Sequence, residues 1–206
     1  MRMAFFKRWL ERYASHQWQK HYQIQQHLQT IDQLYANVNG FIISKSARLQ
    51  DDLALTYGEI DLLSFLALLS LTSPQADWQF YELGCGLGKT VLAASLCYQF
   101  KKSIGVECLA PLLEVAKRCN AHHNIEFILA DLQQLCYHDA NLIFINIASF
   151  VPEVWQALNT HLQAYPDAYI ITCAKPLATS IVTRQTWVKC SWGIVPAYIQ
   201  YFPKKD

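Results

Sequence analysis

A glycine-rich segment that follows an apolar run carries the residues best suited to chemistry in this sequence. It reads Glu82-Leu83-Gly84-Cys85-Gly86-Leu87-Gly88-Lys89, with an acid at its start and three glycines at alternate positions. Glycine lets a backbone turn tightly and approach a ligand closely, and a helix that begins after the loop offers unpaired N–H groups. We therefore expect this segment to bind a small ligand through Glu82, Gly84, Cys85, Gly86, Gly88 and Lys89.

Three kinds of ligand compete for this loop. A phosphate-binding loop needs four residues between its first glycine and Gly-Lys-Ser/Thr, whereas only three separate Gly84 from Gly88. A dinucleotide fingerprint has the spacing Gly-x-Gly-x-x-Gly, and a pyrophosphate would lie poorly beside Glu82. S-adenosylmethionine carries an ammonium group, which an acid such as Glu82 can bind. The pattern resembles the first motif of class I methyltransferases, which implies S-adenosylmethionine as the cofactor.

Two further acids follow the next two expected strands. Glu107 ends the second strand, where it can accept hydrogen bonds from both ribose hydroxyls, although a dinucleotide site uses an acid in the same way. Asp131, followed by Leu132, comes after the third strand, where it can bind the adenine amino group. Each acid alone is equally well explained as a surface acid or a helix N-cap. Together, at the carboxyl ends of consecutive strands, they favour a cofactor site.

The order of elements predicts an α/β fold. Short apolar strands are expected at 78–83, 104–107, 125–129, 142–146 and 168–173, separated by helices at 89–100, 111–121 and 152–164. This alternation is typical of a parallel sheet with right-handed crossovers. Two final strands, at 186–190 and 197–202, predict an antiparallel hairpin at one edge. We therefore expect a Rossmann-like class I methyltransferase sheet with an antiparallel C-terminal hairpin.

The first fifty residues differ in pattern from the rest. Apolar residues recur at helical spacing over 5–37, and Asn39-Gly40 is expected to end this helical region. The basic residues of this region do not cluster on one face, so a packing role is favoured over a nucleic-acid-binding arm. We predict an N-terminal helical cap at 1–50 and a catalytic domain at 51–206.

Composition excludes several classes of protein. Apolar residues make up 52% and charged residues 16% of the 206, which argues against a disordered chain. Lys and Arg number 17 against 16 Asp and Glu, so strong nucleic-acid binding is not expected. None of the seven cysteines forms Cys-x-x-Cys, and we expect reduced thiols and no metal site. The longest apolar run, 62–71, is too short to span a bilayer, and the N-terminus does not resemble a signal peptide, so a cytoplasmic protein is expected.

Three further segments carry a closer resemblance. Leu55-Thr56-Tyr57-Gly58-Glu59 precedes the apolar helix, Asn146 to Val154 follows the fourth strand, and Ser191-Trp192 stands near the C-terminus. Together they resemble the non-SET histone lysine methyltransferases of the disruptor of telomeric silencing family, over about residues 55–201. The resemblance implies methyl transfer to a protein lysine. It implies that Tyr57, Gly58 and Glu59 cover the cofactor, that Asn146 is the polar residue of the lysine channel, and that Phe150, Trp192 and Tyr198 form its aromatic walls.

The sequence also departs from that family. Ile147, Ala148 and Val151 replace the family's second Asn, first channel Phe and Gly, and Lys204-Lys205 is all that stands for its basic segment. We therefore expect the fold and the chemistry to carry over better than the histone substrate. A methyltransferase acting on a small molecule or a nucleic acid remains an alternative, although Asn146 lacks the Pro-Pro of amino-group DNA methyltransferases. A non-catalytic protein with the cofactor fold is a further alternative.

Overall fold

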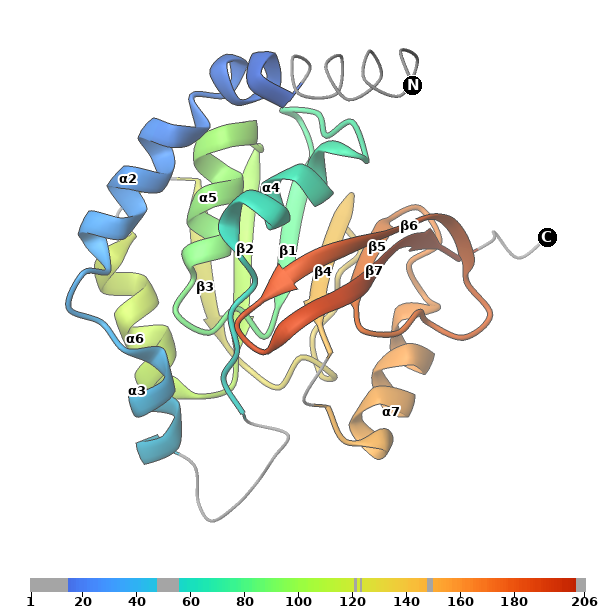
Figure 1. Ribbon diagram of the computed structural model, residues 1–206. Helices are drawn as coiled ribbons and strands as arrows, with labels where there is room; N and C mark the ends of the chain where they lie inside the picture. The colour runs from blue at the N-terminus through green and yellow to red at the C-terminus, as the bar shows by residue number, and fades with distance from the viewer. Residues whose placement is uncertain (1–14, 48–55, 121, 123, 148–149, 203–206) are drawn as a thin grey trace.

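A seven-stranded sheet with the strand order β3-β2-β1-β4-β5-β7-β6 organises the chain (Figure 1). The computed structural model describes residues 15–47, 56–120, 122, 124–147 and 150–202. Five strands are parallel, and β7 runs antiparallel to both of its neighbours, β5 and β6. The strands are β1 (Gln79–Leu83), β2 (Lys102–Glu107), β3 (Ile125–Leu129), β4 (Leu142–Asn146), β5 (Tyr169–Cys173), β6 (Ile181–Cys190) and β7 (Gly193–Tyr201). The Rossmann-like sheet and the antiparallel hairpin predicted from the sequence are thus confirmed.

Helices cover both faces of the sheet, as the apolar strands require. On one face lie α4 (Leu62–Ser70), α5 (Lys89–Tyr98) and α6 (Ala110–Cys119), and on the other lies α7 (Pro152–Leu162). Side chains along β4 alternate between the two resulting cores, with Phe144 packed on the α4 side and Ile143 on the α7 side. Burial on both faces explains why β4 and β5 are nearly continuous apolar runs.

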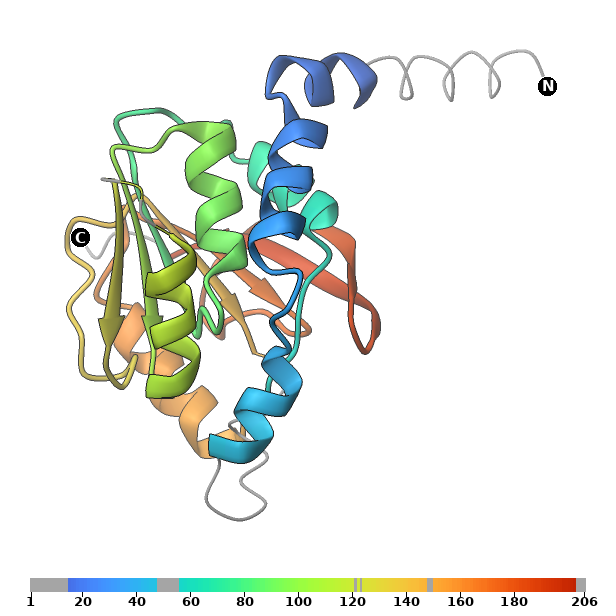
Figure 2. The same cartoon turned by 90° about the vertical axis from the view of Figure 1, so that its left-hand side faces the viewer.

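The N-terminal region contributes α2 (Ile24–Leu34) and α3 (Gly40–Ala47), which pack against α5 and α6 (Figure 2). Ile24 and Ile31 belong to the same buried cluster as the inner side of α5. The break predicted at Asn39-Gly40 separates two helices, since α2 ends at Leu34 and α3 begins at Gly40. Asn39 Oδ1 accepts a hydrogen bond from the Ile42 amide at 3.1 Å, which is the N-cap role that asparagine favours. The predicted boundary at residue 50 lies outside the described residues.

The parallel strands place their carboxyl ends at one edge of the sheet, at the bottom of Figure 1. The segment that leads into α4 passes this edge and lies beside the tip of the β6–β7 hairpin (Figure 1). Of the helices that the structure describes, none has the length and apolar character needed to cross a membrane.

Candidate active site

A cleft of about 1330 Å³ opens at the carboxyl ends of the parallel strands. Small-molecule sites are typically about 300–1,000 Å³, so this cleft has room for a cofactor and for part of a second reactant. Most of the site residues predicted from the sequence line it: Tyr57, Gly58, Glu59, Glu82, Gly84, Cys85, Gly86, Lys89, Glu107, Asp131, Leu132, Asn146, Phe150 and Trp192. Two predicted residues, Gly88 and Tyr198, are not among its lining residues.

The glycine loop is held close to β2 by its own backbone. The Gly84 and Cys85 amides both donate to the Val106 carbonyl at 2.9 Å. Gly86 has a φ of 54°, and a Cβ on it would lie 2.6 Å from the Tyr57 ring, so only glycine fits there. Gly88 instead faces the core, where a Cβ would lie 2.6 Å from the Phe127 ring. Gly88 therefore shapes the loop from behind the cleft.

Glu82 is a buried carboxyl group at the end of β1. Its relative exposure is 5%, and the Thr90 hydroxyl donates to it at 2.5 Å. Burial, and to a smaller extent the charge of Glu107, raises the pKa of Glu82 to about 8. A cation placed beside it would favour the ionised form. This buried acid therefore suits the ammonium group of S-adenosylmethionine.

Glu107 ties the glycine loop to the start of α6. Its Oε2 accepts from the Gly86 amide at 2.9 Å, and its Oε1 accepts from the Cys108 and Leu109 amides at 2.8 and 2.9 Å. A carboxylate offers about four acceptor positions. The Cys108 thiol also donates to Oε1, at 3.4 Å. In this conformation Glu107 can therefore accept at most one more hydrogen bond, and only in place of this thiol contact, whereas both ribose hydroxyls would donate two.

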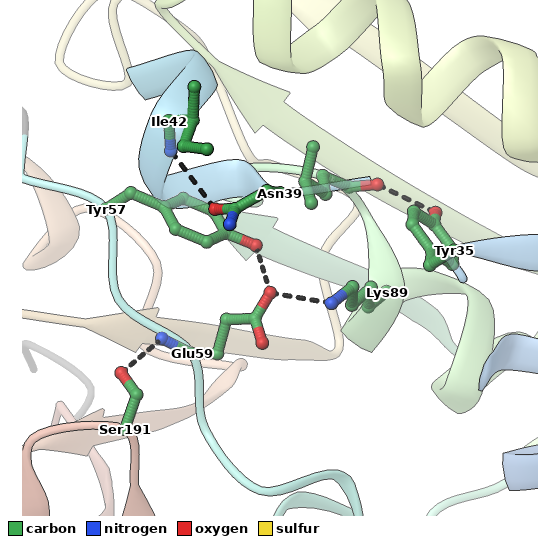
Figure 3. Close-up of polar contacts among 8 residues, drawn as sticks. Tyr35, Asn39, Ile42, Tyr57, Glu59, Lys89 and Ser191 are labelled. Carbon is green, nitrogen blue, oxygen red and sulfur yellow. Dashed lines mark hydrogen bonds and ion pairs between the residues drawn. The ribbon is translucent and has the colours of Figure 1, made fainter. Parts of the chain in front are cut away.

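The segment around Tyr57 and Glu59 covers the glycine loop (Figure 3). Glu59 Oε1 accepts from the Tyr57 hydroxyl at 2.6 Å and pairs with Lys89 Nζ at 2.7 Å. Burial, followed by the charge of Glu59, raises the pKa of Tyr57, so its hydroxyl stays protonated as a donor. The covering segment is thus fastened to the first residue of α5.

The same segment is also fastened to the β6–β7 turn. The Ser191 amide donates to the Glu59 carbonyl at 2.7 Å. The Glu59 amide in turn donates to Ser191 Oγ at 3.1 Å (Figure 3). Ile60 and Cys190 form an antiparallel bridge. A Cβ on Gly58 would lie 2.4 Å from the Trp192 ring, so the segment packs directly on this aromatic side chain.

One residue of the cleft lining, Asn146, contains an unusual polar atom. Asn146 lies at the end of β4, and its buried Oδ1 has no hydrogen-bond partner. Buried acceptors are normally paired, so this oxygen is suited to a donor on a ligand. Apolar and aromatic side chains line the same cleft, namely Phe144, Phe150, Val151, Val154 and Trp192.

Tyr198 lies away from this group. It stands on β7 between Ala197 and Ile199, which are buried in the core on the α4 side. Because side chains alternate along a strand, Tyr198 projects from the opposite face of the sheet. The structure therefore does not bring Tyr198 to the predicted channel.

The charge of the cleft is mostly negative. Among the described residues that line it, Lys89 is the one Lys or Arg, against the acids Asp32, Glu59, Asp61, Glu82, Glu107 and Asp131. Such a lining favours cationic ligands over phosphates. Within the part of the chain that the structure describes, no three His, Cys, Asp or Glu side chains are grouped so as to hold a metal ion.

Comparison with known families agrees with this geometry. The model of the family described as histone methylation protein DOT1 matches residues 50–187. This chain belongs to the DOT1 family. It has the class I methyltransferase fold, and the cofactor of that fold is S-adenosylmethionine. The glycine loop and the buried Glu82 at its start fit this cofactor.

Solved structures show the same fold at low sequence identity. An RNA methyltransferase from Salinibacter ruber, in complex with S-adenosyl-L-homocysteine, has a TM-score of 0.58 and 20% identity over 69% of this chain and 92% of its own. TrmN from Thermus thermophilus has a TM-score of 0.61 and 16% identity, over 76% of this chain and 53% of its own. Magnesium protoporphyrin IX methyltransferase from Synechocystis PCC 6803, with bound S-adenosylmethionine, has a TM-score of 0.57 and 12% identity, over 85% of this chain and 91% of its own. None of the curated proteins matches the sequence.

The DOT1-family site predicts a pH-dependent affinity for its cofactor. Without the cofactor Glu82 is largely protonated at neutral pH, because its pKa is raised from 4.5 to about 8. Since the ammonium binds the carboxylate, we expect the affinity to rise about tenfold per pH unit below pH 8 and to level off above it. Calorimetry from pH 6 to pH 9 on the wild type and Glu82→Gln checks this. The ratio of the two dissociation constants isolates Glu82, because the ligand's own groups titrate equally in both.

The same substitution is expected to stabilise the protein without cofactor. A carboxyl group whose pKa is raised in the folded state holds its proton there after the unfolded chain has released it. Stability is therefore lost as the pH rises from about 4.5 towards 8. Glu82→Gln removes this loss, and its free energy of unfolding at pH 7 should be about 1–3 kcal/mol higher in urea denaturation. A less stable variant would contradict the raised pKa.

Proposed function

We propose that this protein transfers a methyl group from S-adenosylmethionine to the side-chain amine of a protein lysine. The observation that carries the proposal is the buried, unpartnered Oδ1 of Asn146, which lines the cleft together with apolar and aromatic side chains. A neutral amine can donate a hydrogen to this oxygen while its lone pair remains free to react. Membership of the DOT1 family supports the same acceptor.

The residues divide into two groups under this proposal. Those of the glycine loop and the strand ends bind the cofactor, together with the covering residues Tyr57, Gly58 and Glu59. Asn146 orients the acceptor amine, and Phe150 and Trp192 wall its path. The bound cofactor supplies a methyl group on a positively charged sulfur. The protein contributes alignment of the reactants and exclusion of water.

Lysine suits the walls and the charge of this cleft. A free lysine amine has a pKa of about 10.4 and attacks only when it is neutral. The acidic lining attracts the incoming ammonium, and the apolar surfaces near Asn146 then lower its pKa by desolvation. Water can take the released proton, so the proposal requires no histidine or carboxylate base.

Nucleic acid is a poorer acceptor than a lysine side chain, because the lining of the cleft is acidic. One of the similar folds reported above belongs to an RNA methyltransferase. A nucleic acid would bring phosphates towards the acidic cleft lining, and the whole chain has a net charge of only +1. A small cationic amine would meet no such repulsion. The labelling experiment described next distinguishes such an acceptor from a protein lysine.

The product identifies the acceptor. The protein is incubated with methyl-labelled S-adenosylmethionine and a cell extract, and labelled macromolecules are hydrolysed to amino acids. We expect the label in methyl-lysine, and we expect Asn146→Ala in the same incubation to leave little label. Label found only in methyl-arginine, a nucleobase or a small metabolite would contradict the lysine acceptor. No transfer to any acceptor, with cofactor binding intact, would favour a non-catalytic binding protein.

A further inference from the structure

Tyr35 connects the N-terminal helices to the glycine loop. It directly follows α2 and lies outside residues 50–187, the part that matches the DOT1 family. Its hydroxyl donates to the Leu87 carbonyl at 2.8 Å and accepts from Asn120 Nδ2 at 2.8 Å. Only 5% of Tyr35 is exposed, so water does not readily replace these bonds. One buried hydroxyl thus joins α2, the end of α6 and the glycine loop.

Tyr35 reaches the glycine loop at the carbonyl of Leu87. It stands between Gly86 and Gly88, whose φ values are 54° and 73°. Glycine-rich backbone has many accessible conformations, and holding it in one of them is entropically costly. The Val106 carbonyl and the Glu107 carboxylate hold the loop as far as the Gly86 amide, and the Gly88 amide donates to the Cys85 carbonyl at 2.8 Å. The Tyr35 hydroxyl fixes the Leu87 carbonyl, which follows Gly86 in the loop.

The ring of Tyr35 supports a second residue of the site. Lys89 Nζ lies 5.4 Å from the centroid of this ring, within the range of a cation–π interaction. Lys89 also pairs with Glu59 of the covering segment. Tyr35 therefore acts on the loop through its hydroxyl and on the Lys89–Glu59 pair through its ring.

We propose that Tyr35 is a positioning residue of the cofactor site, and that the N-terminal helices hold the glycine loop in its binding conformation. The inference rests on the cofactor-binding part of the proposed function and is independent of the acceptor. The sequence predicts only a packing role for α2. Under this proposal α2 also supports the residues that bind the cofactor.

A conservative substitution separates this role from general packing. Tyr35→Phe keeps the ring but leaves the buried Leu87 carbonyl without its donor. We expect the dissociation constant of S-adenosyl-L-homocysteine, measured by calorimetry on the full chain, to rise about tenfold. Tyr35→Leu also removes the ring under Lys89 and should weaken binding further. Asn120→Ala, which releases the hydroxyl, should weaken binding in the same direction by a smaller factor.

Tyr98→Phe is the matched control. The Tyr98 hydroxyl donates to the Leu66 carbonyl at 2.5 Å, and the residue is 6% exposed, so the chemical change is equivalent. Tyr98 lies at the other end of α5 and does not line the cleft. We expect both variants to lose similar stability in urea, but only Tyr35→Phe to lose cofactor affinity.

Amide hydrogen exchange gives a second readout. Exchange at residues 84–89 should be faster in Tyr35→Phe than in the wild type and in Tyr98→Phe. Unchanged affinity and exchange in Tyr35→Phe, or equal losses in both variants, would overturn the positioning role. A wild type that binds no S-adenosyl-L-homocysteine would contradict the methyltransferase function instead, and the exchange comparison would still test the contact with the loop.

Discussion

Replacing Gly86 with arginine is expected to abolish binding of S-adenosylmethionine. A Cβ at this position would lie 2.6 Å from the Tyr57 ring, and the φ of 54° is one that side chains rarely adopt. The remaining atoms of arginine would enter the cleft that Gly86 lines. We expect the dissociation constant to rise by more than about 1,000-fold, which calorimetry would register as no detectable binding.

Gly193→Ala controls for backbone strain alone. Gly193 has a φ of 139°, and no atom lies within 4 Å of where its Cβ would be. It is not among the residues that line the cleft. We expect this variant to lose some stability and to bind the cofactor as the wild type does. If Gly86→Arg retained its affinity while folding normally, the glycine loop would not be the cofactor site.

Replacing Asn146 with alanine is expected to lower turnover about 100-fold, with less than about a threefold change in cofactor affinity. The reason is that the Asn146 Oδ1 has no hydrogen-bond partner in the structure, and under the proposed function it accepts a hydrogen bond from the reacting amine. Alanine removes this oxygen and leaves the apolar walls of the cleft in place. The rate of label transfer and the calorimetric dissociation constant are measured on the same preparation.

Asn159→Ala serves as the control for this second prediction. The Asn159 side chain also accepts a hydrogen bond, from the Ala178 amide at 2.8 Å, but it does not line the cleft. Turnover should be close to that of the wild type in this variant. Equal losses of cofactor affinity and turnover in Asn146→Ala would assign Asn146 to the cofactor rather than to the acceptor.

The parallel part of the sheet could be predicted because its strands are short apolar runs with polar ends. The strands at 125–129 and 142–146 have the expected bounds. β6 was predicted to start at residue 186 but starts at Ile181. Residues 181–185 are exposed, so neither face of this edge strand produces the alternation of apolar and polar residues from which a strand is recognised. An edge strand pairs with its neighbour through backbone groups, so the types of its side chains say little about where the strand begins.

Site residues divide in a similar way. Glu82, Glu107 and the glycines could be found because each stands at a fixed place beside a strand end. Tyr35 could not, because its partner Leu87 is 52 residues away and helical spacing indicates only that Tyr35 is buried. Tyr198 was matched to the channel through a one-residue gap, and a shift of one residue moves a strand side chain to the other face.

The covering segment joins the two ends of the cleft. Its residues 57–60 lie against the glycine loop on one side and are hydrogen-bonded to the turn that carries Trp192 on the other. A displacement of this segment would therefore also break the hydrogen bonds that join it to the turn carrying Trp192. The two sides of the cleft are tied mechanically through four residues of the chain, so a substitution that loosens one contact is expected to loosen the other.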